Sequence, residues 1–435
     1  MKRNLRDLHP GGRQHGGALP KILLLIVFFA LLVGFFYWKS VRGVTGTVVD
    51  MPGTTANSIA LIRREGRQSS IVLVRPDGTG EQTLVSDDKN KLSLCWSPDG
   101  RALCYAAEVA GDQGRANQLF IHDGRGSRQI TQGTVSKDLP QWRPNGGQIG
   151  FLTGGTVKII ATNGEGMEQI YPPPHKGGGG TESDQEDDDA RRKPPLDSFR
   201  WSPDGSGIAG VQITEGEQAP AIGQGRWWDR GNVPGESDAA PSIVEPETLV
   251  LLPGLSEKPQ ILFGTNSREL SFDWMPDSKR IAVSISSRGA QHGIGLFRTD
   301  ETRIPPQGLL TSSGYTIAPR NVSVSPDGNW LAFEVYRLSS AEDSSLMGIA
   351  VLSTDPAKAV QVNTPGDIGR LKFVVKGDAR KPRWSPDGSK LLYTSPNAAK
   401  TANDVWAVGA DGSNPVNLTK GRGDNSDAAW SPAKK

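Results

Sequence analysis

The sequence is poor in the side chains that most often carry out chemistry: it has five histidines and two cysteines in 435 residues. His9 and His15 precede a long apolar run, His175 lies in a segment rich in proline and glycine, and His292 lies in a predicted connection between strands. His122 ends a predicted strand beside a turn, where a histidine is by default at the surface. No H-E-x-x-H, C-x-x-C or G-x-S-x-G occurs, and no histidine has neighbours that suggest a triad or a metal set. We therefore expect no cofactor or metal, and a binding protein rather than an enzyme.

A large net charge is absent as well. The chain carries 49 Lys and Arg against 47 Asp and Glu, a formal charge of +2. Residues 1–21 hold five of these cations and one acid, so they contribute +4 and the remainder is about −2. A nucleic-acid footprint requires a clustered basic surface. The charge balance therefore excludes nucleic acid as the expected partner.

The two cysteines, Cys95 and Cys104, lie on either side of one predicted turn, on neighbouring strands. This placement puts them close to opposite each other. In an oxidising compartment they could form a cross-strand disulfide, although directly opposed strand residues often have unsuitable geometry for one. The alternative is that both are small, buried apolar side chains.

The sequence has one long apolar run, Ile22–Trp38, with 17 uncharged residues. At 1.5 Å per residue such a helix spans roughly 25 Å, which is adequate for a bilayer when Lys21 and Lys39 reach the interface. The run is followed by no A-x-A-like cleavage site, which favours an uncleaved anchor over a signal peptide. The basic tail before it places the N-terminus in the cytoplasm and the rest of the chain outside.

What the sequence does contain is a repeat of the pentapeptide W-S-P-D-G, intact in three copies and altered in others. The intervals between first residues are 46, 59, 73, 50, 60 and 46. A period of ~40–50 residues with loop insertions is typical of a β-propeller in which each repeat is one blade. We predict an all-β, seven-bladed propeller whose repeat tryptophans fill the space between blades. The seven copies begin at Trp96, Trp142, Trp201, Trp274, Val324, Trp384 and Trp430.

Each copy predicts four antiparallel strands, here called A to D, with the tryptophan at the end of strand A. Proline and glycine suit the A–B turn, and we expect its aspartate to hold the turn by Asx-type hydrogen bonds. The copy at Trp430 is followed by no further strands, and residues 58–85 predict three strands with no A strand before them. One C-terminal strand and three N-terminal strands would complete a blade and close the ring.

The repeat resembles that of the TolB-type propeller family. The shared features are the W-S-P-D-G turn, an apolar B strand, a D-G turn and a D strand such as Asn417-Leu418-Thr419. The resemblance covers about residues 58–434, and bacterial TolB is a periplasmic member of the family. Related repeats form the propeller of prolyl-oligopeptidase-like enzymes. TolB has six blades and a separate N-terminal domain, whereas here we count seven blades after a short linker.

The predicted connections differ in length between the two faces of the ring. A–B and most C–D turns are short, whereas the long segments 171–197 and 363–380 are predicted to join D to A, and 214–245 and 337–347 to join B to C. We therefore expect the binding face on the side of the B–C and D–A connections. The acidic run 182–189 favours a solvated loop over a cation site.

One insertion supplies the candidate binding residues Arg226, Trp227, Trp228 and Arg230. Paired aromatic rings flanked by arginine could stack on a sugar or grip a peptide. The alternative is that both tryptophans pack the loop onto the rim of the propeller.

The predicted organisation is a cytoplasmic basic tail (1–21), a transmembrane signal anchor (22–38), a linker (39–57) and a TolB-like propeller (58–435). The expected function is that of a protein- or glycan-binding or scaffolding module of the bacterial envelope, in the periplasm or outside the cell. Its partners would be an envelope protein or glycan, and the cytoplasmic membrane through residues 22–38. The alternative is an envelope enzyme, a hydrolase or lyase, with its site over the propeller channel.

Overall fold

The computed structural model describes residues 57–432, apart from 112–113, 174–194, 214–246, 256–257, 266–269, 287–290, 302–304, 315 and 341–343. The predicted tail and anchor, residues 1–38, and all but the last residue of the predicted linker lie outside this part. In the described ranges, no helix is long and apolar enough to cross a membrane.

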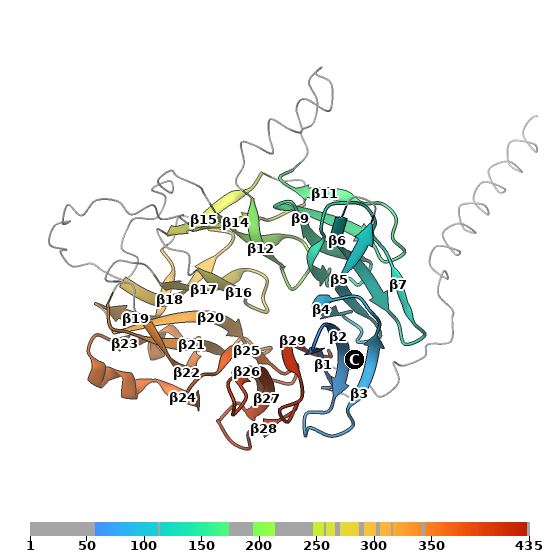
Figure 1. The fold of residues 1–435 in the computed structure, drawn as a ribbon. Coiled ribbons are helices and arrows are strands. Elements are labelled where there is room, and N and C mark those ends of the chain that lie inside the picture. The colour runs from blue at the N-terminus through green and yellow to red at the C-terminus, as the bar shows by residue number, and fades with distance from the viewer. Residues whose placement is uncertain are drawn as a thin grey trace, which may run out of the picture. The chain divides into compact units, whose positions relative to one another are not determined.

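The described strands form seven separate sheets, which confirms the predicted all-β fold with seven blades (Figure 1). The first three sheets are β29 (Asp424–Trp430), β1 (Ile59–Glu65), β2 (Gln68–Val74), β3 (Gln82–Ser86); β4 (Lys91–Trp96), β5 (Leu103–Gly111), β6 (Gly114–His122), β7 (Ser127–Gln129); and β8 (Asp138–Trp142), β9 (Gln148–Thr153), β10 (Thr156–Ala161), β11 (Glu168–Tyr171). The fourth sheet and the fifth are β12 (Leu196–Trp201), β13 (Ile208–Ile213), β14 (Glu247–Leu252), β15 (Gln260–Thr265); and β16 (Ser271–Trp274), β17 (Arg280–Ser286), β18 (Gln291–Arg298), β19 (Gln307–Ser313), β23 (Val360–Val362). The last two are β20 (Ile317–Val324), β21 (Trp330–Leu338), β22 (Ser344–Ser353), β24 (Lys372–Lys376); and β25 (Arg380–Trp384), β26 (Lys390–Pro396), β27 (Asn403–Gly409), β28 (Val416–Asn417).

The first strand of each sheet lies on the inside of the ring. Strand β4 contacts β8 and β29, and β20 contacts β16 and β25, although none of these pairs belongs to one sheet. The sheets are therefore arranged radially around the inner strands (Figure 1). The apolar core lies between neighbouring sheets: one cluster joins Ala60 and Ile71 of the first sheet to Leu94, Leu103 and Tyr105 of the second.

Ring closure occurs as predicted. Strand β29 pairs antiparallel with β1, with Trp430 opposite Ile59 and Asn425 opposite Arg63. A buried contact reinforces the pairing, because Arg63 Nε donates to Asn425 Oδ1 at 3.1 Å. The C-terminal strand thus covers the edge that β1 would otherwise expose.

The repeat turns also have the predicted hydrogen bonds. In the first intact copy, Ser97 Oγ donates to Asp99 Oδ1 at 2.6 Å and the Arg101 amide donates to the same oxygen at 3.1 Å. The same serine-to-aspartate bond, also at 2.6 Å, recurs at Asp204, Asp327 and Asp387. Gly100 has φ 69, a conformation that glycine adopts without steric cost.

Four of the repeat tryptophans donate a hydrogen bond to the preceding blade. Trp96 is 7% exposed, and its Nε1 donates to the Ala429 carbonyl of the preceding blade at 3.1 Å. Three other repeat tryptophans donate in the same way to a backbone carbonyl of the preceding blade. In each case the carbonyl belongs to the residue directly before the repeat position of that blade. The pairs are Trp274 with Arg200, Trp384 with Ser323, and Trp430 with Arg383. Among the described residues, Nε1 of Trp142 and of Trp201 has no such partner.

The predicted path of the chain between residues 353 and 380 is wrong. Segment 363–380 was expected to join D to A, but the long connection joins C to D, from β22 to β24, and contains η1 (Pro356–Lys358), β23 and η2 (Pro365–Arg370). Strand β23 pairs parallel with β19 of the preceding blade and makes that sheet five-stranded. Long connections therefore occur on both faces of the ring. The reason is that the short strand β23 pairs with a strand of another repeat.

Cys95 and Cys104 lie directly opposite each other in the β4–β5 pairing, as predicted. Both thiols are free, and Cys104 is buried. Burial raises the pKa of the Cys104 thiol, and hydrogen bonding with Cys95 acts in the same direction. The structure thus has two free thiols, of which Cys104 is buried and Cys95 is half-buried.

Candidate functional site

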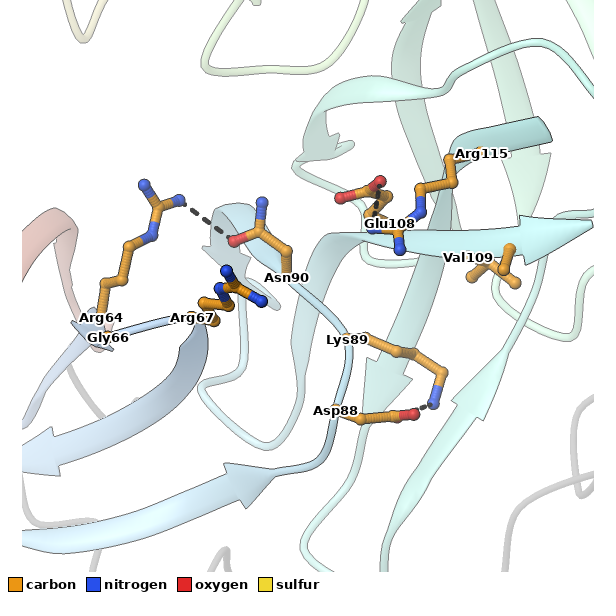
Figure 2. A pocket seen from close by; sticks show the side chains of 10 residues that line it. Arg64, Gly66, Arg67, Asp88, Lys89, Asn90, Glu108, Val109 and Arg115 are labelled. Atoms are coloured by element: carbon orange, nitrogen blue, oxygen red, sulfur yellow. Dashed lines mark hydrogen bonds and ion pairs between the residues drawn. The ribbon is translucent and has the colours of Figure 1, made fainter.

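A groove with a volume of about 530 Å³ opens between the first and second blades (Figure 2). Its lining comes from two B–C hairpins and one D–A connection, which are β1–β2, β5–β6 and β3–β4. It therefore lies on the face on which the sequence places the binding surface. The lining residues are Arg64, Gly66, Arg67, Asp88, Lys89, Asn90, Glu108, Val109, Ala110 and Arg115.

The first wall is the tight β1–β2 hairpin. Gly66 has φ 62 and a Cβ added there would meet nothing within 4 Å, so the glycine is required by the turn and not by packing. This turn places Arg67 at the tip, where it is exposed. Arg64 donates from Nη2 to the amide oxygen of Asn90 at 3.0 Å.

The floor is the β3–β4 connection, which is fixed from below by Lys91. The Lys91 side chain is fully buried; its Nζ contacts Asp87 Oδ1 and donates to the Lys89 carbonyl at 2.8 Å. Burial opposes ionisation of Asp87, but hydrogen bonds from Lys91 and the Lys89 amide outweigh it and lower the pKa of this carboxyl. The Glu108 amide donates to the Asn90 carbonyl at 2.9 Å, which ties the floor to the second wall.

The groove carries an excess of positive charge. Its four cations are Arg64, Arg67, Lys89 and Arg115, and its two carboxylates are Asp88 and Glu108, so the formal sum is +2. Arg115 pairs with Glu108 at 3.1 Å, and Lys89 Nζ lies 3.6 Å from Asp88. Within the described part of the chain, Arg64 and Arg67 pair with no carboxylate. These two guanidinium groups therefore remain available to an acidic ligand.

A second set of side chains, most of them polar, lies on the inner strands at the residue directly before each repeat position. We call this set the inner ring: Cys95, Gln141, Arg200, Asp273, Ser323, Arg383 and Ala429. Two of these side chains, Gln141 and Asp273, bind the backbone of the inner strand of the next blade, and Gln141 Nε2 donates to the Phe199 carbonyl. Asp273 Oδ2 accepts from the Val324 amide of the next blade at 2.9 Å.

Charges in and beside the inner ring influence one another. Arg200 Nη1 lies 3.7 Å from Asp273 Oδ1. The positive charge of Arg200, followed by burial, lowers the pKa of Arg383 to about 10. Burial raises the pKa of Asp427, against the hydrogen bond that it accepts from the Leu94 amide and the charges of Arg383 and Lys381. Arg383 and Asp427 are nevertheless both exposed to solvent.

The predicted binding residues Arg226, Trp227, Trp228 and Arg230 lie outside the described residues. Their connection leaves β13 at Ile213 and returns at Glu247, so it is a B–C connection like the two hairpins of the groove.

Two histidine predictions are wrong. His122 was expected at the surface but is 7% exposed, with Nδ1 3.1 Å from Ser127 Oγ, and burial lowers its pKa. His292 was expected in a connection but lies in β18 and is 3% exposed. His175 is outside the described ranges. In the part of the chain that is described, no three His, Cys, Asp or Glu side chains are grouped so that they could hold a metal ion.

Sequence reasoning missed both the groove and the inner ring. The groove combines residues from three connections in two repeats, and none of these connections is long. The inner ring had a simple signal: aligning the copies on their tryptophan places Arg200, Asp273 and Arg383 in one column. Charged residues just before a buried repeat tryptophan could have been singled out from that column.

Neither a protein-family model nor a curated protein sequence matches the chain. Among solved structures, the chain is similar to an oligogalacturonate lyase in complex with manganese, with 11% identity, a TM-score of 0.53, and coverage of 84% of this chain and 86% of the lyase. It is also similar to TolB from Acinetobacter baumannii (13% identity, TM-score 0.45, 91% of this chain and 70% of TolB). An acylaminoacyl peptidase from Pyrococcus horikoshii is a third (12% identity, TM-score 0.46, 76% of this chain and 46% of the peptidase). At these identities the similarity to the lyase shows a shared fold alone.

Proposed function

We propose that this chain is a membrane-anchored β-propeller of the bacterial envelope that binds an acidic protein segment or glycan on the face bearing the B–C and D–A connections. The observation that carries the proposal is the groove between the first two blades. Its volume is within the ~300–1,000 Å³ of ordinary ligand sites, and two of its arginines are paired with no described carboxylate.

The electrostatics of the groove suit an acidic ligand. A net charge of +2 in a concave site attracts anions and orients them during encounter. The fixed floor also supports binding, because a preorganised surface loses less conformational entropy on association. The buried Lys91 and the Glu108 amide supply this rigidity, because they hold the carbonyls of Lys89 and Asn90.

The test is a charge reversal at the two arginines that lack a described carboxylate partner. Full-length protein would be titrated with oligoglutamate and, separately, with alginate, at low and at moderate salt. We expect Arg64→Glu with Arg67→Glu to weaken binding at least tenfold, about 1.4 kcal/mol, and to reduce its salt dependence. The matched control is Arg101→Glu, an exposed arginine at the A–B turn of the second blade. Unchanged affinity for both ligands in the double variant would refute the groove as the site.

The insertion with the paired tryptophans is proposed as a second contact on the same face. We expect Trp227→Ala with Trp228→Ala to weaken binding of the same ligands without a change in melting temperature, since an aromatic anchor typically contributes ~2 kcal/mol or more when it is a hot spot. Equal affinity at equal stability would assign both side chains to packing.

The proposed anchor and location rest on the uncharged run Ile22–Trp38 and on the basic tail before it. A reporter that fluoresces only in a reducing cytoplasm, fused after Lys435, should give dark cells. Bright fluorescence at the membrane would contradict the proposed orientation.

A further inference from the structure

A second hollow, here called the neutral pocket, adjoins the groove along the β5–β6 hairpin. Its volume is about 350 Å³, and it shares Val109 and Ala110 with the groove. The rest of its lining comes from the same hairpin and from residues 129–134, at the end of β7 and in the connection that follows. Glu108 and Arg115 form their ion pair on one face of the hairpin, and Val109 lies on the opposite face, because side chains alternate along a strand. The hairpin therefore separates the two hollows.

The connection that lines the neutral pocket is held in the same way as the floor of the groove. Lys137 is 5% exposed, and its Nζ donates to the carbonyls of Gln132 at 2.8 Å and Val135 at 2.6 Å. Like Lys91, it stands five residues before a repeat tryptophan (137 to 142, as 91 to 96). The two lysines thus fix equivalent D–A connections in successive blades, and both hollows are preorganised.

Among the described residues that line the neutral pocket, none carries a charged side chain, whereas the groove has four cations and two carboxylates. The polar side chains of the pocket are three glutamines and one threonine. Gln118 is fixed, because its Nε2 donates to the Gly133 carbonyl at 2.7 Å and its Oε1 accepts from Thr131 Oγ1 at 2.9 Å. A charged ligand group would lose water here without gaining an ion pair, whereas an uncharged amide would find both donors and acceptors.

The outer edge of β6 is open beside this pocket. From Asn117 onward the edge is covered, because the Asn117 amide donates to Ser136 Oγ at 3.1 Å and its carbonyl accepts from the Lys137 amide at 2.9 Å. Two residues earlier, Arg115 directs its own amide and carbonyl to the same side, since backbone groups alternate along a strand. No residue of the described part of the chain bonds to these two groups. An edge of this kind accepts an extended peptide by main-chain pairing.

We propose that the partner is an extended peptide with two adjoining runs: acidic residues that bind the groove, and uncharged residues that pair with the edge of β6 in the neutral pocket. The acidic run rests on the proposed function, and the uncharged run extends it. Because the two hollows share Val109 and Ala110, one chain can contact both. The site suits a peptide better than a glycan, because a strand edge pairs with a peptide main chain and the described linings include no aromatic ring on which a sugar could stack.

The test is calorimetric titration of the full-length chain with synthetic peptides. The probes are capped tetraglutamate, tetraglutamate extended by Ser-Ala-Ser-Ala at either end, and the same extended peptides with the amides of the uncharged run N-methylated. We expect the extension at one end to tighten binding about tenfold. N-methylation should abolish this gain, because it removes the donors that main-chain pairing needs. An alginate tetramer, which has the same charge as tetraglutamate, is the glycan probe.

Gln132→Trp fills the neutral pocket without a change of charge, and it breaks no described side-chain bond. It should abolish the gain, so that the extended peptide binds no more tightly than tetraglutamate. The matched control is Gln361→Trp, at an exposed glutamine of β23 in the fifth sheet, which should retain the gain. If Gln132→Trp fails to fold, Thr134→Trp replaces it, at another exposed residue of the lining.

The outcomes distinguish a failure of the groove from a failure of the extended-peptide site. If tetraglutamate does not bind, or if charge reversal at Arg64 and Arg67 leaves its affinity unchanged, the groove fails and the peptide site fails with it. If that reversal weakens binding but the uncharged run adds no affinity at either end, the groove stands and the extended peptide is refuted. A gain that survives N-methylation or Gln132→Trp overturns the proposal as well, and so does tighter binding of the alginate tetramer than of the extended peptide.

Discussion

Replacing Trp430 by phenylalanine should destabilise the propeller more than the same replacement at Trp201. Both tryptophans occupy the repeat position and both are less than 10% exposed. Their indole N–H groups differ: Trp430 Nε1 donates to the Arg383 carbonyl at 3.1 Å, whereas Trp201 Nε1 is buried with no partner in the described structure. The two substitutions remove the same apolar area, so the hydrophobic loss nearly cancels in the comparison.

The expected difference follows from the polar groups. At Trp430 the variant loses a hydrogen bond with a net contribution of about 1 kcal/mol, and at Trp201 it removes a buried N–H whose desolvation costs about 1–3 kcal/mol. The gap is therefore at least about 2 kcal/mol. Residues 57–432 have an unfolding entropy of about 0.8 kcal/mol/K at ~2.1 cal/mol/K per residue. Trp430→Phe should melt roughly 2.5 °C or more below Trp201→Phe.

Differential scanning calorimetry is the suitable assay, because both variants alter the tryptophan fluorescence. The wild type, the two single variants and the double variant would be melted in the same buffer. The two positions lie in different blades, so their effects should add. Equal melting temperatures for the single variants would refute the view that indole-to-carbonyl bonds hold neighbouring inner strands together.

Three further predictions concern closure, pH and the repeat turn. Removing residues 424–435 should expose the β1 edge and remove Trp430 from its apolar cluster. Calorimetry should therefore show a melting temperature lower by about 5 °C or more. An unchanged melting temperature would contradict ring closure. Burial, followed by the charge of Arg320, lowers the pKa of His292 to about 4. Because the unfolded state takes up the proton at a higher pH, the free energy of unfolding should be at its full value above pH 6.5 and lower by about 2 kcal/mol at pH 5. In urea titrations, His292→Asn should flatten this pH dependence. Burial opposes ionisation of Asp387, but hydrogen bonds from Ser385 and Ser389 outweigh it and lower its pKa to about 2. The resulting stabilisation is present above the unfolded pKa near 4 and is lost toward pH 2, so the stability of Asp387→Asn should fall less in acid than that of the wild type. Identical stability profiles in acid would refute the turn bonds.

The fold could be predicted because its determinants are local and recur. Each W-S-P-D-G copy encodes a turn whose proline, aspartate and glycine act within five residues, as the Ser97–Asp99 bond shows. The number of copies then fixes the number of blades. Closure was also predictable, since the last copy lacks three strands and the N-terminus supplies three.

The path of residues 353–372 could not be predicted in the same way. Strand β23 has three residues and pairs parallel with β19, about 50 residues earlier in the chain. A pairing of this kind depends on which edge is open nearby, and no local pattern records it. The burial of His122, which is at the end of its own strand, was missed as well.

By itself, the sequence determined the class of fold, the number of blades, the closing strand and the direct opposition of Cys95 and Cys104, because each follows from turn chemistry and alternation within one repeat. Only the tertiary structure decided which charges meet. Arg200 and Asp273 are 73 positions apart in the sequence, by the difference of their numbers, yet they lie 3.7 Å apart, and the groove joins Arg64 to Arg115 across two blades. Electrostatic interaction depends on distance in space and on the surrounding dielectric, and the radial packing of the blades sets both.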